Sequence, residues 1–178
     1  GLHAQKQWTK DPSGPIPVNG VAGSWNYSVF SPCVLYNEDS SRYEMWFDGS
    51  GGPAKPWDPY QVGHARSTDG HTWTVPVVTP VLSPGPGGWD SVGTGGVFVI
   101  RESGQYKMWY TGWTGGYVHM GYATSPDGTT WTKYAGNPII SPDTASWEGT
   151  GLGDPFIEKT VGGYRMWYTG GQGKTYGI

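Results

Sequence analysis

Three similar segments of alternating side chains stand out along the chain. In each, Tyr, Met and an aromatic residue fall on one face, and a charged residue followed by Trp falls on the other. Their sequences are YEMWFDG (43–49), YKMWYTG (106–112) and YRMWYTG (164–170). Because successive side chains of a β-strand point to opposite faces of a sheet, this pattern predicts strands that are largely buried on both sides.

Shorter β-rich runs flank each of these segments. The runs that precede and follow them are 31–36 and 61–67, 96–100 and 119–125, and 154–159 and 175–178. A fourth type of strand opens at Trp8, Trp73 and Trp131. The near-copies STDGHTW (67–73) and SPDGTTW (125–131) lie before two of these strands, and their Asp-Gly pairs supply the positive φ angles of a tight turn. Each unit is therefore predicted to contain four antiparallel strands.

Four-stranded units repeated along one chain are typical of β-propeller blades. We expect an all-β fold and a single propeller segment over residues 1–178, with repeats at approximately 8–72, 73–130 and 131–178. The N-terminal strand would complete a last blade. Since propellers have about four to eight blades, three blades leave three alternatives. In the first, a second chain closes the ring head-to-tail. In the second, the chain is a fragment of a longer propeller, and in the third, the blades form an open arc. The homo-oligomeric ring of two chains is the favoured prediction.

The composition supports this interpretation. The chain has 31 Gly and 15 Pro in 178 residues, but its 11 Trp and 12 Tyr argue against disorder. No segment of helical length carries apolar residues at helical spacing without an interrupting Gly or Pro. An aromatic chain divided into short runs by Gly and Pro is typical of β structure.

Charge and cysteine content limit the partners. The formal net charge is −3 and no run of Lys or Arg occurs, so we expect no nucleic-acid partner. The apolar runs are too short to span a membrane, and we expect no membrane partner. Cys33 is the single cysteine, which excludes an internal disulfide and a cysteine-based zinc site. No spacing suggests a metal site, and we expect no cofactor.

The motifs resemble a known group of proteins. The segments YRMWYTG, GYATSPDGTTWTK, NPII and WEGTGLGDPFI are similar to those of the propeller glycoside hydrolases and phosphorylases, which include arabinanases, invertase-like fructosidases and mannoside phosphorylases. The resemblance covers nearly the whole chain, mostly through structural residues. It implies a five-bladed fold, with carbohydrate cleaved or bound in a central funnel.

The resemblance also implies a catalytic carboxylate at Asp154. Its Asp-Pro pair matches the group's Asp-Pro at the start of an innermost strand, and the equivalent positions of the other repeats hold Gly96 and Ser31. A carboxylate present in one repeat of three is a candidate base or charge stabiliser. Glycoside cleavage of this type uses two carboxyl groups, one of which is a general acid. No second innermost-strand carboxylate matches, so a non-catalytic module that binds glycans or proteins is the alternative.

Two further carboxylates are candidate catalytic residues, and Glu148 is the candidate for the acid. Asp48 replaces the Thr of the other repeats, at the mouth of the long loop 48–60. Glu148 lies six residues before Asp154, although Asp90 at its equivalent position favours a structural role in the loop.

Aromatic residues near these carboxylates are candidates for sugar binding. The loop 48–60 holds Trp57, Asp58 and Tyr60, and the corresponding loop of the next repeat holds Trp113. Aromatic rings stack on the apolar faces of sugars while carboxylates accept hydrogen bonds from sugar hydroxyls. The alternative is that these loops cap the funnel or contact another chain.

Overall fold

The fold is built almost entirely of strands. The computed structural model describes residues 9–51, 59–172 and 175–178. Besides the short 3-10 helix η1 (Glu38–Ser40), the elements are β1 (Ser28–Asn37), β2 (Arg42–Ser50), β3 (Gln61–Ser67), β4 (Gly93–Glu102), β5 (Gln105–Thr114), β6 (Tyr117–Ser125), β7 (Thr132–Lys133), β8 (Gly151–Thr160), β9 (Gly163–Gln172) and β10 (Thr175–Gly177). None of the described residues belongs to a helix that could cross a bilayer.

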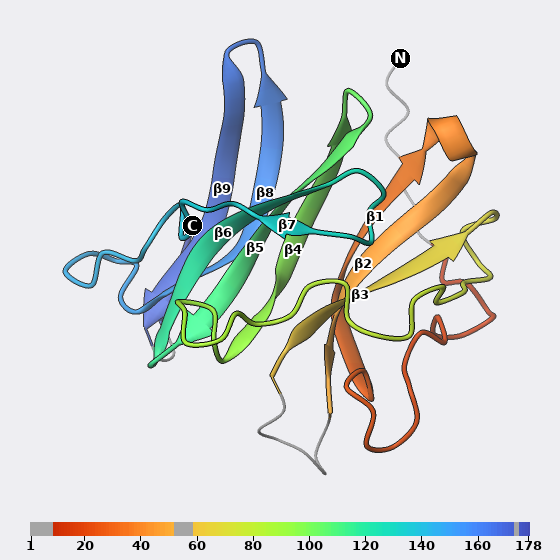
Figure 1. Ribbon diagram of the computed structural model, residues 1–178, viewed down its shortest axis with the longest axis horizontal. Coiled ribbons are helices and arrows are strands. Elements are labelled where there is room, and N and C mark those ends of the chain that lie inside the picture. Colours follow the sequence, from red (N-terminus) through yellow and green to blue (C-terminus); the bar gives the residue numbers. More distant parts are fainter. Residues whose placement is uncertain (1–8, 52–58, 173–174) are drawn as a thin grey trace.

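The strands form three antiparallel meanders, which we call blades 1, 2 and 3. Blade 1 contains β1–β3, blade 2 contains β4–β6 and blade 3 contains β8–β10. Figure 1 shows the blades side by side in chain order, with blades 1 and 3 at the two ends of an arc. The prediction of an all-β, propeller-type fold is confirmed by this arrangement, which is part of a propeller.

The predicted fourth strand is reduced in blades 1 and 2, and the N-terminal strand expected to open at Trp8 lies outside the described residues. In blade 1 it consists of two isolated bridges to β3, at Thr74 and Leu82. In blade 2 it consists of β7 and one bridge, at Ile140, to β6. Prolines lie between the two contacts in both blades, for example Pro76 and Pro138. Because proline has no backbone N–H to donate, it interrupts a ladder of hydrogen bonds.

The Asp-Gly turns close the hairpins that lead to this fourth strand. Asp69 accepts hydrogen bonds from the backbone N–H groups of His71 and Thr72, at 2.8 and 2.7 Å. Asp127 accepts the equivalent bonds from Thr129 and Thr130, both at 2.7 Å. These carboxylates therefore satisfy turn amides, as predicted for turn residues.

Each innermost strand contains the same irregularity. The register of β1, β4 and β8 with its neighbour shifts between Phe30 and Cys33, Gly95 and Phe98, and Gly153 and Phe156. Within each shift one residue has a positive φ: 51° at Ser31, 55° at Gly96 and 47° at Asp154. A β-bulge of this kind redirects side chains locally. It occurs at the repeat position where the sequence places Asp154.

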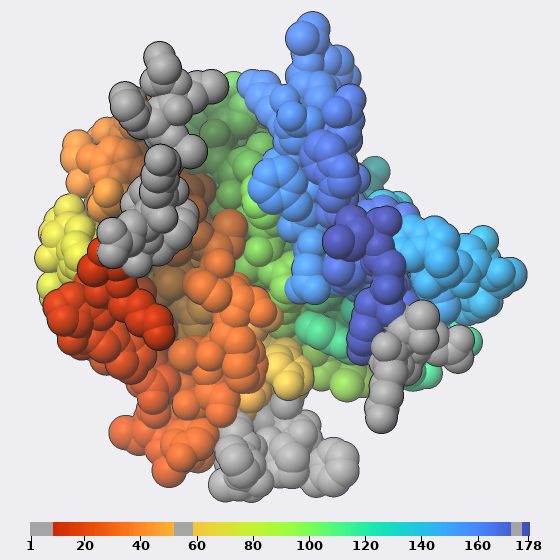
Figure 2. Space-filling model, turned by 180° about the vertical axis from the view of Figure 1, so that it is seen from behind, coloured from red at the N-terminus to blue at the C-terminus, as the bar shows by residue number. Residues whose placement is uncertain are grey.

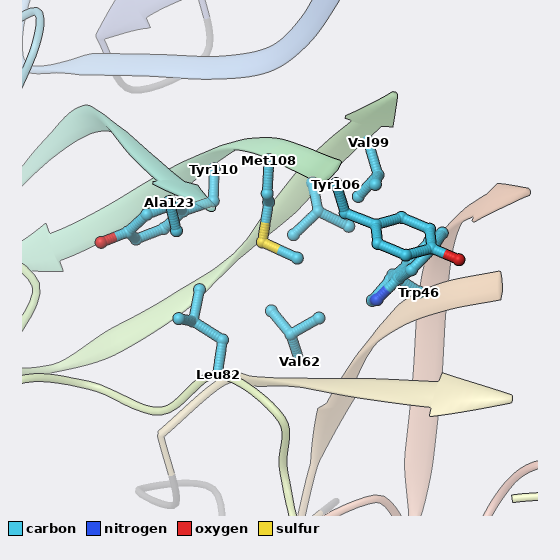
Figure 3. Close-up of a cluster of buried hydrophobic side chains, with 9 residues drawn as sticks. Trp46, Val62, Leu82, Val99, Tyr106, Met108, Tyr110 and Ala123 are labelled. Atoms are coloured by element: carbon cyan, nitrogen blue, oxygen red, sulfur yellow. The ribbon is translucent and has the colours of Figure 1, made fainter. Parts of the chain in front are cut away.

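The main core lies between blades 1 and 2. Trp46 and Val62 of blade 1 pack against Met108, Tyr106 and Tyr110 of blade 2, as Figure 3 shows. The indole of Trp46 is fully buried, and its Nε1 donates a hydrogen bond of 2.8 Å to the carbonyl of Gly128. Burial of apolar side chains between neighbouring sheets therefore holds the blades together.

A buried carboxylate accepts a hydrogen bond across the same interface. The Glu44 carboxylate is fully buried and accepts hydrogen bonds from Asn37 Nδ2 at 3.1 Å and from the Tyr106 hydroxyl at 3.0 Å. His64 Nε2 lies 3.1 Å from its other oxygen. Burial opposes ionisation of Glu44, but the hydrogen bonds from His64, Asn37 and Tyr106 outweigh it and hold the pKa of Glu44 at about 2. Blade 1 therefore presents an ionised acceptor to a tyrosine of blade 2.

The interface core yields a first prediction. Trp46→Ala removes a fully buried indole and a hydrogen bond between blades, so we expect the free energy of unfolding to fall by about 3–5 kcal/mol. Trp147→Ala is the matched control, because Trp147 is 52 % exposed and stacks on Tyr168 at one end of the arc; a loss of about 1 kcal/mol is expected. Urea unfolding measures both. Equal losses would contradict the assignment of the core to this interface.

Candidate functional site

A pocket of about 520 Å³ lies on the concave side of the arc. Figure 2 shows blade 1 in orange and blade 3 in blue on either side of a hollow lined by the green strands of blade 2. All three blades contribute to the pocket. Its lining residues include Phe30, Ser31, Asp48, Tyr60, Gly96, Thr111, Trp113, Val118, Leu152, Asp154, Thr169 and Tyr176.

Two repeated positions supply the polar lining. The first is the bulge position of the innermost strands, occupied by Ser31, Gly96 and Asp154. The second lies on the neighbouring strands β2, β5 and β9, and is occupied by Asp48, Thr111 and Thr169. Each set contains one carboxylate. The fold therefore brings together Asp48 and Asp154, which are 106 positions apart in the sequence.

Asp48 is buried where blade 1 meets the bulge of blade 2. Its two carboxylate oxygens lie 3.1 and 2.9 Å from the backbone nitrogen of Gly96, which donates to them. A Cβ atom on Gly95 would lie 2.8 Å from Oδ2 of Asp48, so a bare backbone is needed there. Ser31, at the bulge of β1, lines the same pocket.

The environment of Asp48 favours its protonated form. Burial is the main cause, and the negative charge of Asp154 adds to it, while the hydrogen bond from Gly96 acts in the opposite direction. The net result raises the pKa of Asp48 to about 7. A carboxyl group of this kind can hold a proton near neutral pH and release it to a bound molecule.

Asp154 has a different environment in the same pocket. Its side chain is exposed to solvent, and Thr169 Oγ1 donates a hydrogen bond of 3.3 Å to its Oδ2. The positive φ of Asp154 is uncommon for a residue with a side chain and arises from the bulge in β8. Two carboxyl groups, one buried and one exposed, therefore face one cavity.

Aromatic side chains form one wall of the pocket. Tyr60 stacks on Trp113 with a centroid separation of 5.6 Å and an interplanar angle of 28°, and Phe30 lies 5.7 Å from Tyr60. Two of the four predicted sugar-binding residues, Tyr60 and Trp113, line the cavity. The other two, Trp57 and Asp58, lie outside the described residues.

The Glu148 side chain makes its hydrogen bonds outside the pocket. Its carboxylate accepts hydrogen bonds of 2.6 Å from the backbone N–H of Asp143 and from the Tyr168 hydroxyl, and it does not line the pocket. Asp90 binds the N–H of Gly85 in the same way, at 3.1 Å. The structure therefore does not bring Glu148 to Asp154. The two residues are only six positions apart in the sequence. Glu148 nevertheless belongs to the loop before β8, whereas Asp154 belongs to the bulge within β8.

Several lining residues were not singled out from the sequence. Phe30, Thr169 and Tyr176 line the pocket beside the predicted carboxylates. Phe30 directly precedes Ser31, whereas the other two repeats have glycine at its position, and this difference was an available signal. In the described part of the chain, His, Cys, Asp and Glu residues do not gather into a group of three that could hold a metal ion.

Sequence comparisons identify related proteins. No protein-family model matches the chain. Rv1502, an uncharacterized protein of Mycobacterium tuberculosis, is 28 % identical over 152 residues, which are 84 % of this chain and 49 % of that protein. The acid beta-fructofuranosidase AIV-18 of Capsicum annuum is 31 % identical over 147 residues, or 78 % of this chain and 19 % of the enzyme. The chain thus spans about half or less of the length of these relatives.

Solved structures show the same fold. A glycoside hydrolase superposes with a TM-score of 0.71 at 21 % identity, covering 86 % of this chain and 45 % of that one. Zg3597, a family 117 glycoside hydrolase of Zobellia galactanivorans, gives 0.68 at 17 % identity, covering 84 % and 50 %. The chain therefore resembles the β-propeller glycoside hydrolase superfamily in sequence and has its fold, which confirms the resemblance predicted from the sequence motifs.

Proposed function

We propose that the chain is the site-bearing part of a carbohydrate-active propeller that cleaves glycosidic bonds in the pocket between its blades. The observation that carries the proposal is the pair Asp48 and Asp154. Asp48 is buried, Asp154 is exposed, and both line a single cavity. Pairs of carboxyl groups in contrasting environments divide into an acid and a base. The printed names of similar proteins, glycoside hydrolase and acid beta-fructofuranosidase, support a carbohydrate substrate.

In this proposal Asp48 is the general acid. Its proton passes to the glycosidic oxygen as the bond between that oxygen and the anomeric carbon breaks. Asp154 acts on the anomeric carbon side, either as a carboxylate that stabilises the developing positive charge or as the base that takes a proton from the attacking water. Thr169, which donates to Asp154, orients that carboxylate.

The aromatic wall would bind the sugar. The stacked rings of Tyr60 and Trp113 present apolar surface beside the carboxylates, and Tyr176 is 74 % exposed at another part of the lining. Sugar rings pair an apolar face with a rim of hydroxyl groups, which matches such a wall. Trp57 and Asp58, predicted from the same loop as Tyr60, stay candidates for sugar binding.

A non-catalytic module that binds glycans or proteins is the second candidate function. It is favoured by the innermost-strand position of Asp154, which holds Ser31 and Gly96 in the other two described blades and therefore supplies a single carboxylate. The same aromatic wall would serve binding without cleavage.

Hydrolysis of a panel of aryl furanosides and pyranosides tests the proposal. We expect turnover by the wild type, and a fall in kcat of about 100-fold or more for Asp48→Asn and Asp154→Asn, because each loses proton transfer or charge stabilisation. The control is Glu158→Gln, an exposed carboxylate outside the pocket lining. If no substrate is turned over but calorimetry still detects sugar binding, the enzyme proposal is wrong and the non-catalytic binding module is favoured.

The protonated Asp48 also predicts a dependence of stability on pH. Its ordinary pKa is 3.8 and its folded pKa is about 7, so the folded protein binds this proton more tightly than the unfolded chain. The resulting stabilisation is fully present below about pH 4 and is lost as the pH rises through about 7. Asp48→Asn cannot ionise. Relative to wild type, its free energy of unfolding is therefore expected to rise by up to roughly 4 kcal/mol across this range.

Urea unfolding of both proteins at several pH values between about 4 and 8 makes this measurement. Parallel stability curves for the wild type and Asp48→Asn would contradict the proposed protonated, buried carboxyl. This readout requires no substrate, so it separates the state of Asp48 from the question of catalysis.

A further inference from the structure

One peptide unit of blade 2 is held by a side chain on each of its two sides. It joins Gly95 to Gly96 in the bulge of β4. The Thr111 hydroxyl donates a hydrogen bond of 2.8 Å to the carbonyl oxygen of Gly95. The N–H of the same unit, that of Gly96, donates to Oδ2 of Asp48 at 2.9 Å. Because the carbonyl and the N–H of a trans peptide point in opposite directions, Thr111 and Asp48 lie on opposite sides of this unit.

The pairing of β4 with β5 leaves this peptide unit outside the regular ladder. Gly95 lies opposite Thr111, but the next paired residue of β4 is Phe98, opposite Trp109. Gly96 has no partner in this register, and its φ is 55°. The extra residue of a bulge is not fixed by ladder hydrogen bonds. The direction of the Gly96 N–H therefore depends on the side chains that bind the peptide.

Both hydrogen bonds are shielded from solvent and closely fitted. The side chains of Thr111 and Asp48 belong to residues that are 2 and 5 % exposed. A Cβ atom on Gly96 would lie 2.9 Å from the Thr111 hydroxyl oxygen, and one on Gly95 would lie 2.8 Å from Oδ2 of Asp48. Hydrogen bonds in such surroundings are stronger than in water. The two glycines thus make room for one contact each.

The equivalent threonine of blade 3 makes a different contact. Thr169 lies opposite Gly153 of β8, as the pairing of blade 2 leads one to expect. Its hydroxyl donates directly to the Asp154 carboxylate at 3.3 Å. Gly96 stands at the position of Asp154 in blade 2 and offers Thr111 no side chain to bind. One threonine therefore holds a carboxylate directly, and the other holds the peptide that binds a carboxylate.

We propose that Thr111 is a positioning residue for Asp48, because its hydroxyl fixes the Gly95–Gly96 peptide with the N–H aimed at the Asp48 carboxyl group. The inference deepens the proposed function and takes its catalytic meaning from it. An N–H donor stabilises the ionised form of a carboxyl group. When Asp48 gives up its proton to a leaving group, this donor stabilises the carboxylate that forms.

The same contact limits how far burial raises the pKa of Asp48, since the hydrogen bond from Gly96 acts against the desolvation. The other titratable groups in the described pocket lining are Asp154, Tyr60 and Tyr176. The negative charge of Asp154 raises the pKa of Asp48 further. Thr111 carries no charge, so replacing it adds and removes none in the pocket. A change in the titration of Asp48 would then report on the peptide.

A pH titration of the Gly96 amide resonance in isotope-labelled protein tests the proposal without a substrate. The shift of this N–H follows the ionisation of Asp48, with an expected midpoint of about 7 in the wild type and no titration in Asp48→Asn. Thr111→Val removes the hydroxyl at nearly constant volume. We expect its midpoint to rise by about one pH unit, because the ionised carboxylate loses a well-aimed donor.

Two matched variants separate the hydroxyl from other effects of substitution. Thr111→Ser keeps the donor and is expected to keep the wild-type midpoint. Thr169→Val removes the equivalent hydroxyl of blade 3 and is expected to leave the Gly96 titration unchanged. The dispersion of the amide spectrum checks folding, and Thr111→Ala is the second variant without a hydroxyl should valine not be accommodated.

Three results would overturn the role of Thr111: an unchanged midpoint in a folded variant without the hydroxyl, an equal rise in Thr111→Ser, or an equal rise in Thr169→Val. A rise confined to the Thr111 variants without a hydroxyl supports it, even if no glycoside is cleaved, in which case only the proposed cleavage fails. Where turnover is measured, the alkaline limb of the kcat profile should move upward with the midpoint, because the acid stays protonated to higher pH.

Discussion

Burial of aromatic and aliphatic side chains between neighbouring blades is the interaction on which the rest of this structure depends. A three-stranded meander has two faces, and the alternating pattern of its central strand makes both of them apolar. No single blade can cover both. Trp46 illustrates the solution, because its indole is fully buried only where blade 2 lies against it. Stability therefore comes from the stacking of blades around an axis.

The same constraint creates the pocket. Blades that pack along their faces converge at their innermost strands, and a bulge at one repeated position in β1, β4 and β8 turns a residue toward the concave side. The bulge of blade 2 does more, because the bare backbone at Gly95 and Gly96 lets the Asp48 carboxylate approach from blade 1. The desolvation that raises the pKa of Asp48 is thus a consequence of blade packing.

Equivalent positions have diverged in chemistry while keeping their geometry. Asp48 has threonine counterparts at Thr111 and Thr169, and Asp154 has Ser31 and Gly96 as counterparts. The shared backbone provides places for side chains around the hollow, and only some places hold carboxylates. By contrast, Glu148 and Asp90 keep similar loop hydrogen bonds in two blades, which is the behaviour of a structural residue.

By itself the sequence determined the three inner strands of each blade, their order and the role of the Asp-Gly turns, because alternation and turn chemistry are local properties of the chain. It also determined that Asp154 and Asp48 are exceptional, since each departs from its own repeat. Only the tertiary structure decided that these two side chains share a cavity, that Phe30 and Tyr176 line it with them, and that Glu148 does not. Proximity across blades and loss of hydration depend on how faces pack together, and neither quantity is written in any single repeat.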